Sequence, residues 1–216
     1  MSVDRTVWLL TPSRLEAEAI RPAAHPYAVQ YTGVGALATL HTLWRRYFTE
    51  QPVALSLIVI GIAGSYNGKH PLGSIVYVEK EIWGDLGRRY SRRFIPTPEW
   101  LRDGFPLEWM APPSPLSLAR GIGLTLHALS ANRREARYWS RSYPEATIET
   151  QEGAAFYLFG HAVGAPVYTF RAISNQVGHR RWEREAALDS LATFTRNNVV
   201  PLCERLLAGD SSAHPR

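Results

Sequence analysis

The sequence predicts an α/β fold: a single domain built as a three-layer sandwich, in which helices cover a central mixed, twisted sheet. The first observation is that short apolar runs alternate with segments of helical periodicity, which is the pattern of βαβ units. The second is the run LSLIVIGIAG at residues 55–64, which is typical of a strand covered on both faces. The third is the length of 216 residues, which suits one domain whose core needs no disulfide or metal.

The elements of the first half follow from the spacing of their apolar residues. Runs rich in β-branched and aromatic residues predict strands at residues 6–10, 27–35, 55–64 and 74–83. Leucine and aromatic side chains that recur every three or four residues predict helices at residues 14–23 and 36–48. Pro12 and Ser13 open the first helix, and a Gly-x-Gly turn closes the second strand.

A proline-rich stretch, residues 95–115, interrupts this alternation, and its periodicity disappears. We expect an ordered loop there, because the side chains of Trp100, Phe105, Trp109 and Met110 need apolar cover. Such a loop is able to fold over a site.

The remaining elements return to the earlier pattern. Strands are predicted at residues 121–131, 146–150 and 165–170, and helices at residues 133–143, 152–164 and 182–207. We expect the domain to span residues 1–208, and residues 209–216 to form a frayed tail.

The net charge of +5 raises the question of a nucleic-acid partner. The basic residues gather in residues 86–94, 131–141 and 178–185, and two of these segments carry interleaved glutamates. That pattern is typical of solvated helix faces with ion pairs. We therefore expect no nucleic-acid partner, whereas a small anionic ligand would use the same charge.

Cysteine content and the N-terminus indicate the compartment. Cys203 is the only cysteine, so no internal disulfide is possible, and we expect a reducing, cytoplasmic setting. The apolar stretch before Thr11 is about five residues long, too short for a signal peptide or a membrane span. We expect no membrane association.

Polar residues that directly follow strand runs mark the expected ligand site, because ligands of open α/β sheets bind at the carboxyl ends of the strands. These residues are 32–35, 62–65, Gln151 with Glu152, and 171–176, while Glu16 and Glu18 lie in the helix after the first strand.

Several of these segments together resemble the nucleoside phosphorylase and nucleosidase superfamily, whose members cleave purine N-glycosidic bonds. They are TGVGALATL (32–40), GIAGSYNGKHPLGSIVYV (61–78), EIWGDLG (81–87), ETQEGAAF (149–156) and PVYTFRAISNQVG (166–178). Within the superfamily the chain is most similar to the futalosine hydrolases. The resemblance implies a nucleoside-phosphorylase-like fold, a homodimer, a nucleoside substrate, and hydrolysis of futalosine to hypoxanthine during menaquinone synthesis without a cofactor. We expect no metal site, because the sequence contains no cluster of histidines and carboxylates with the spacing of metal ligands.

The resemblance also assigns roles to two glutamates. Glu152 matches the glutamate that holds the ribose hydroxyls, although alone it could be an ordinary carboxylate in the first turn of a helix. The glutamate that activates water corresponds to Glu18 or Glu16. We favour Glu18 from the register of the Glu-x-Glu pair, and the alternative is that both are solvated helix residues.

Asn175 is expected to select the base. Adenine-specific relatives carry an aspartate there, whereas a 6-oxopurine presents acceptors at O6 and N7. A carboxylate would set lone pairs against lone pairs, but an amide NH2 donates to them. The alternative is a turn asparagine with a local backbone bond.

The remaining site residues support these three. Arg171 and Ser174 are expected to fix the loop around Asn175 and the carboxylate of Glu152. The small residues Gly35, Ala63 and Gly64 would let the backbone approach the ribose and base, and Gln151 stands where relatives usually have methionine. Three aromatic residues are candidates for stacking on the purine, although each is more often core: Trp83, Phe156 and Tyr157.

Three other functions stay open. A phosphorylase would use Arg14 to hold phosphate, but the Pro-Ser that phosphorylases place after the Gly-x-Gly turn is missing from TGVGALATL. A methylthioadenosine/S-adenosylhomocysteine-type nucleosidase would use the same scaffold for an adenine nucleoside. A non-catalytic purine-binding protein would keep Asn175 and Glu152 but could dispense with a glutamate after the first strand.

Overall fold

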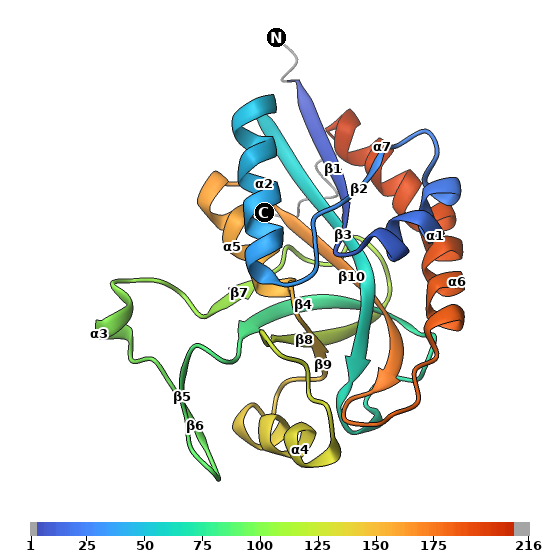
Figure 1. Cartoon of the computed structure of the whole chain (residues 1–216). Coiled ribbons are helices and arrows are strands. Elements are labelled where there is room, and N and C mark those ends of the chain that lie inside the picture. Colours follow the sequence, from blue (N-terminus) through green and yellow to red (C-terminus); the bar gives the residue numbers. More distant parts are fainter. Residues whose placement is uncertain (1–3, 210–216) are drawn as a thin grey trace.

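The computed structural model describes residues 4–209 and shows a mixed sheet of eight strands between helices (Figure 1). The strands of this sheet are β1 (Arg5–Thr11), β2 (Val29–Tyr31), β3 (Ala54–Ser65), β4 (Ile75–Trp83), β7 (Glu108–Met110), β8 (Ala119–Thr125), β9 (Ile148–Thr150) and β10 (Val167–Gln176). A separate hairpin consists of β5 (Gly87–Arg89) and β6 (Phe94–Pro96).

The sheet closes on itself beyond β3. Its order is β10-β4-β8-β9-β3-β1-β2, and β10 also pairs with β3, so five strands form a ring. Strands β1, β2, β3 and β10 run parallel, whereas β4 is antiparallel to β10 and β9 is antiparallel to β3. The predicted mixed sheet is confirmed.

Two cores cover the two faces of β3. On one face, Ile58 and Ile60 pack with α1 (Arg14–Ala24), α6 (Arg184–Phe194) and α7 (Val200–Ala208). On the other, Leu57 and Val59 pack with α2 (Ala36–Glu50) and α5 (Gly153–Val163). Because neighbouring side chains of a strand point to opposite faces, a strand buried on both sides reads as a continuous apolar run. The remaining helices are α3 (Glu99–Arg102), α4 (Arg133–Ser142), a 3-10 turn (Tyr66–Gly68) and a π turn (Thr195–Val199) that joins α6 to α7.

The strand predicted at residues 165–170 is too short. β10 continues through its polar residues to Gln176, paired with β3, and the register shifts between Ile173 and Asn175. The apolar pattern ends at Phe170 because the side chains change character there, not because the backbone leaves the sheet. In contrast, the strand predicted at residues 27–35 shrinks to the three residues of β2.

The expected loop at residues 95–115 contains α3 and β7, and β6 overlaps its start. Trp109 is buried as expected, but Trp100 and Met110 are 79% and 69% exposed. The prediction that Trp100 and Met110 need apolar cover is therefore wrong for the single chain. Within residues 4–209 every helix falls short of the length and apolarity that a membrane crossing needs. Of the predicted tail, only Gly209 lies among the described residues.

Candidate active site

A cavity of about 540 Å³ opens where the carboxyl ends of β3 and β10 meet the first turns of α1 and α5. Seven of the predicted residues line it: Glu16, Ala63, Gly64, Gln151, Glu152, Ser174 and Asn175. The sheet brings these residues together from four separate segments of the chain. Glu18, Gly35 and Arg171 are not among its lining residues.

Glu16 reaches the cavity because it folds back over the start of α1. Ser13 caps this helix, and the backbone N–H of Ser13 donates to Oε2 of Glu16 at 2.8 Å. The backbone N–H of Ile62, on β3, donates to Oε1 at 2.8 Å. With 3% of its surface exposed, the Glu16 carboxylate is fixed between two elements and faces the cavity.

Glu18 lies on a different side of the same helix. Residues two apart on a helix are about 200° apart around its axis, so both cannot face one cavity. The side chain of Glu18 is 54% exposed and forms an ion pair with Arg14 at 2.8 Å. The structure therefore places Glu16 at the cavity, whereas the favoured Glu18 is not among its lining residues.

Glu152 stands at the start of α5, as expected. Its Oε1 accepts a hydrogen bond of 2.8 Å from the backbone N–H of Gly35, and only 7% of its surface is exposed. Burial raises the pKa of this carboxyl, while Arg171 and the Gly35 N–H oppose the rise. Gly35 thus contributes to the site through its backbone, with a φ of 89° that favours glycine.

The register shift in β10 turns Asn175 toward the cavity, as bulges commonly re-aim side chains. The hydroxyl of Ser174 donates to Oδ1 of Asn175 at 3.0 Å, which fixes the orientation of the amide. The amide nitrogen then carries the donors, and one of them meets the carbonyl of Gln176 at 3.3 Å. A side chain at Gly64 would clash with Val177 at 2.8 Å and approach the Asn175 amide at 3.2 Å.

Arg171 lies beneath the cavity and is fully buried. None of its guanidinium nitrogens has a hydrogen-bond partner among the described residues. A Cβ at Gly61 would meet both an Arg171 guanidinium nitrogen and Oε1 of Glu16, so the two charges flank this glycine. Arg171 also opposes the rise in the pKa values of Glu152 and Glu81. Its charge therefore stabilises the ionised forms of Glu152 and Glu81, although Arg171 does not line the cavity.

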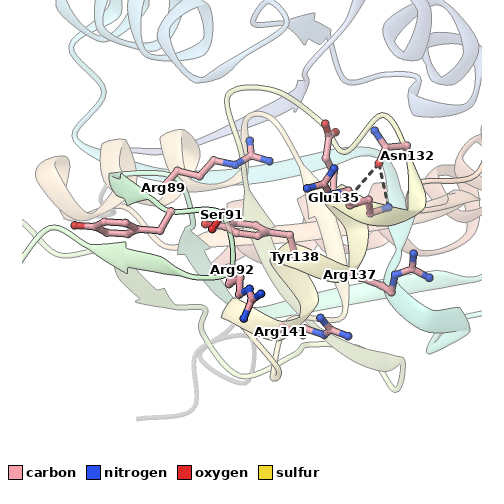
Figure 2. A pocket seen from close by; sticks show the side chains of 10 residues that line it. Arg89, Ser91, Arg92, Asn132, Glu135, Arg137, Tyr138 and Arg141 are labelled. Carbon is pink, nitrogen blue, oxygen red and sulfur yellow. Dashed lines mark hydrogen bonds between the residues drawn. The ribbon is translucent and has the colours of Figure 1, made fainter.

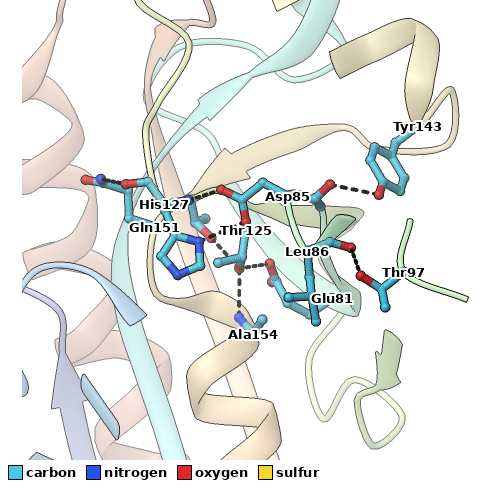
Figure 3. A network of polar contacts seen from close by, with 11 residues as sticks. Glu81, Asp85, Leu86, Thr97, Thr125, His127, Tyr143, Gln151 and Ala154 are labelled. Carbon is cyan, nitrogen blue, oxygen red and sulfur yellow. Dashed lines mark hydrogen bonds and ion pairs between the residues drawn. The ribbon is translucent and has the colours of Figure 1, made fainter. Parts of the chain in front are cut away.

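Glu81, on β4, is a buried carboxyl that the sequence did not indicate. It accepts a hydrogen bond of 2.7 Å from the hydroxyl of Thr125, which in turn accepts from the backbone N–H of Ala154 (Figure 3). The carboxyl occupies space that Gly123 and Gly153 leave open, beside Glu152. Burial raises the pKa of Glu81 to about 7, against the effect of Thr125 and Arg171.

Gln151 has a partner outside the cavity as well. Its amide nitrogen donates to the carbonyl of His127 at 3.0 Å, and Asp85 holds both the backbone N–H and the ring of His127 (Figure 3). Gln151 therefore connects the cavity to His127, after β8, and through His127 to Asp85, after β4.

Other cavity residues were not predicted from the sequence, among them Ser13, Leu129, Glu149, His179 and Trp182. The motif Ser13-x-x-Glu16 is a capping-box pattern and would have indicated that Glu16 turns back toward the helix start. Trp83, Phe156 and Tyr157 belong to the core beneath α2 and α5 and do not line the cavity. Nor does any residue of the loop at 95–115.

The described residues contain no group of three histidine, cysteine or acidic side chains placed to hold a metal ion. The polar groups that the cavity offers include three buried carboxyls, of Glu16, Glu149 and Glu152, and the oriented amide of Asn175. This arrangement can anchor hydroxyls, activate a water molecule and donate to a heterocycle.

No family model matches the chain. A futalosine hydrolase from Thermus thermophilus is 31% identical to it over 96% of this chain and 98% of the relative. The chain belongs to the futalosine hydrolase family. A futalosine hydrolase from Streptomyces coelicolor is 30% identical over 68% of the chain and 66% of that relative.

Solved structures support the fold of this futalosine hydrolase family member. The 5'-methylthioadenosine/S-adenosylhomocysteine nucleosidase of Campylobacter jejuni superposes with a TM-score of 0.73 at 16% identity, over 93% of this chain and 99% of that one. The corresponding nucleosidase of Helicobacter pylori gives 0.72 at 12% identity, over 96% and 100%. These structures confirm the predicted fold, and the futalosine hydrolase relatives confirm the resemblance seen in the sequence.

Proposed function

We propose that the chain hydrolyses the N-glycosidic bond of futalosine and releases hypoxanthine and dehypoxanthine futalosine. The observation that carries the proposal is the convergence of Glu16, Glu152 and Asn175 on one cavity. The chain that builds this cavity is 31% identical to a futalosine hydrolase along nearly its full length.

Glu152 is proposed to hold the ribose hydroxyls. Its Oε1 accepts from Gly35, which leaves Oε2 and the remaining lone pairs for the sugar. A negative carboxylate beside the sugar also stabilises the positive charge that develops as the glycosidic bond breaks.

Glu16 is proposed to activate water, in place of the initially favoured Glu18. Ser13 holds Oε2 through both its N–H and its hydroxyl, whereas Oε1 accepts from the Ile62 N–H and keeps a lone pair for water. A fixed carboxylate within reach of water is what general-base catalysis needs.

Asn175 is proposed to bind the purine edge. Because Ser174 donates to Oδ1, the NH2 group is the part of the amide available to O6 or N7 of a 6-oxopurine. A hydrogen bond to either acceptor stabilises the leaving base as it gains electron density.

Water is proposed as the nucleophile rather than phosphate. Arg14, the candidate phosphate ligand, has a side chain 77% exposed and paired with Glu18, and it does not line the cavity. The cavity instead contains carboxylates, which repel an attacking phosphate dianion.

The setting of the reaction is also a proposal. The reaction is proposed to be a step of menaquinone synthesis, which the name of the relatives supports. It is proposed to take place in the cytoplasm, which the single, buried Cys203 supports. A homodimer is also proposed, and the exposed apolar side chains of Leu37 (72% exposed) and Phe48 (69%) on α2 are candidates for its interface.

A substrate panel tests the proposal. The protein would be incubated with futalosine, aminodeoxyfutalosine, inosine and methylthioadenosine, with and without phosphate, and the products identified by mass. We expect hypoxanthine from futalosine at the same rate in both buffers. Adenine from methylthioadenosine as the main product would contradict the proposed base specificity.

A further inference from the structure

Two of the three basic segments of the sequence, about forty residues apart, meet at one hollow (Figure 2). This hollow, which we call the basic cleft, has a volume of about 670 Å³ and lies between the β5–β6 hairpin and α4. Its charged lining residues are Arg89, Arg92, Arg134, Arg137, Arg141 and Glu135. No residue lines both the basic cleft and the active-site cavity.

The positive charge of the basic cleft is not compensated within the described chain. None of its five guanidinium groups has a carboxylate within 4 Å among residues 4–209. The carboxylate of Glu135 instead accepts a hydrogen bond of 2.8 Å from the backbone N–H of Ala131. The third basic segment differs, because Arg181 and Arg184 pair with neighbouring glutamates.

The two walls of the cleft are held together by aromatic packing. Phe94 of the hairpin lies 5.2 Å from the ring of Trp139 on α4, measured between ring centroids. The guanidinium of Arg89 stacks over Tyr138 at 4.9 Å and over Trp139 at 5.7 Å. Stacking restricts the arginine to few rotamers, so that less entropy is lost when it binds an anion.

Guanidinium groups supply the hydrogen-bond donors of the cleft. Each arginine presents a planar fork of N–H donors, which matches two oxygens of a phosphate or carboxylate group. Tyr138 contributes its ring, over which Arg89 stacks, while its hydroxyl oxygen is buried.

We propose that the basic cleft binds a small multivalent anion, with phosphate or carboxylate groups along a short chain. The volume is that of a small-molecule site, and two walls confine it. Five uncompensated guanidinium groups around one hollow generate a strong positive potential, which concentrates anions there. The site is independent of the proposed hydrolysis, because the cavity and the cleft share no residue.

Calorimetric titration of the full chain at low salt tests the proposal. Inorganic tripolyphosphate represents the phosphate source and citrate the carboxylate source, and the tighter of the two identifies the group. The test variant is Arg137→Gln/Arg141→Gln. The matched control is Arg21→Gln/Arg45→Gln, which removes the same net charge from exposed arginines on α1 and α2, outside the cleft.

We expect one anion to bind the parent chain, and the cleft variant to weaken its binding by about tenfold for each arginine removed. The control variant should weaken anion binding by less than about threefold, because it changes only the overall electrostatic field of the protein. Equal weakening in both variants, or no binding of either anion to the parent, would overturn the proposal.

A single-stranded oligonucleotide is the third ligand. If it binds more tightly than either small anion at equal ionic strength, and loses affinity in the cleft variant alone, the small-ligand assignment is wrong. The expected result is weaker binding of the oligonucleotide, because a confined cleft accepts few of its phosphates.

Discussion

The active-site cavity and the basic cleft are hollows of similar size, about 540 and 670 Å³, yet they hold charge in opposite ways. In the cavity, the carboxylates are buried and fixed by backbone donors, as Glu16 is by Ser13 and Ile62. In the cleft, the arginines are exposed and lack acidic partners among the described residues. Buried, oriented groups favour chemistry, whereas exposed, uncompensated groups favour capture of an ion. The effect of a substitution should therefore differ greatly between the two regions.

The largest expected effect is at Glu16. Glu16→Gln should lower kcat for futalosine by about a thousandfold, because an amide cannot accept a proton from water. Steady-state kinetics would measure it. The matched control is Glu18→Gln on the same helix, which should change kcat by less than about twofold, since an exposed ion pair contributes little. The reverse order of effects would restore Glu18 as the base.

Asn175→Asp should have the next largest effect, on the choice of base. We expect kcat/KM for futalosine to fall by about a hundredfold, because a carboxylate faces the acceptors of the 6-oxopurine. The ratio of kcat/KM for aminodeoxyfutalosine to kcat/KM for futalosine should rise. Gln176→Glu makes the same amide-to-acid change one residue later, outside the cavity lining, and should leave that ratio unchanged. A constant ratio in both variants would remove Asn175 from base selection.

Glu81→Gln should change the pH dependence of stability. The folded carboxyl has a pKa of about 7, above its unfolded value of 4.5, so the folded state binds more protons between these values. The parent chain consequently loses stability as pH rises through this window. The variant lacks this loss. As pH rises from 4.5 to 7, its free energy of unfolding should rise relative to that of the parent by up to about 3 kcal/mol.

Urea unfolding at several pH values measures this difference. Glu79→Gln is the matched control, because Glu79 is partly exposed on the same strand and pairs with Arg120. Parallel pH profiles for the parent and the Glu81 variant would contradict the raised pKa.

The smallest expected effect is in the basic cleft. Arg137 has arginines four residues away on both sides, Arg133 and Arg141, and like charges at this spacing destabilise a helix. Arg137→Gln should raise the free energy of unfolding by about 0.5 kcal/mol at low salt, and by almost nothing at high salt. Arg45→Gln on α2, with no charged residue three or four positions away, should change it at neither salt concentration. A gain that survives high salt would show that the like-charge cost is not its cause.

Much of the scaffold could be predicted from the sequence because its signals are local. The run at 55–64 indicated a strand covered on both faces, and α1 begins at Arg14, directly after its Ser13 cap. The end of β10 could not be predicted in this way. Its polar residues stay in the sheet because β3 pairs with them as far as Gln176 and β4 pairs with Arg171, and both pairings are between distant segments.

The site shows the same limit. Residues at strand ends, such as Glu152 and Asn175, were found because the topology of α/β sheets places them together. The choice between Glu16 and Glu18 depends on a rotation around α1 that the resemblance alone did not resolve. Glu81 lies in the charged stretch Glu79-Lys80-Glu81 of β4, where an exposed side chain is expected. No local pattern indicates that two glycines from other elements make room for it.

Hydrolysis of futalosine in phosphate-free buffer made with H2¹⁸O tests the central claim most directly. Mass analysis should find free hypoxanthine without the label and a sugar product that carries one ¹⁸O atom, and Glu16→Gln should form both about a thousandfold more slowly. A reaction that begins only when phosphate is added, or a chain that leaves futalosine intact, would contradict the account.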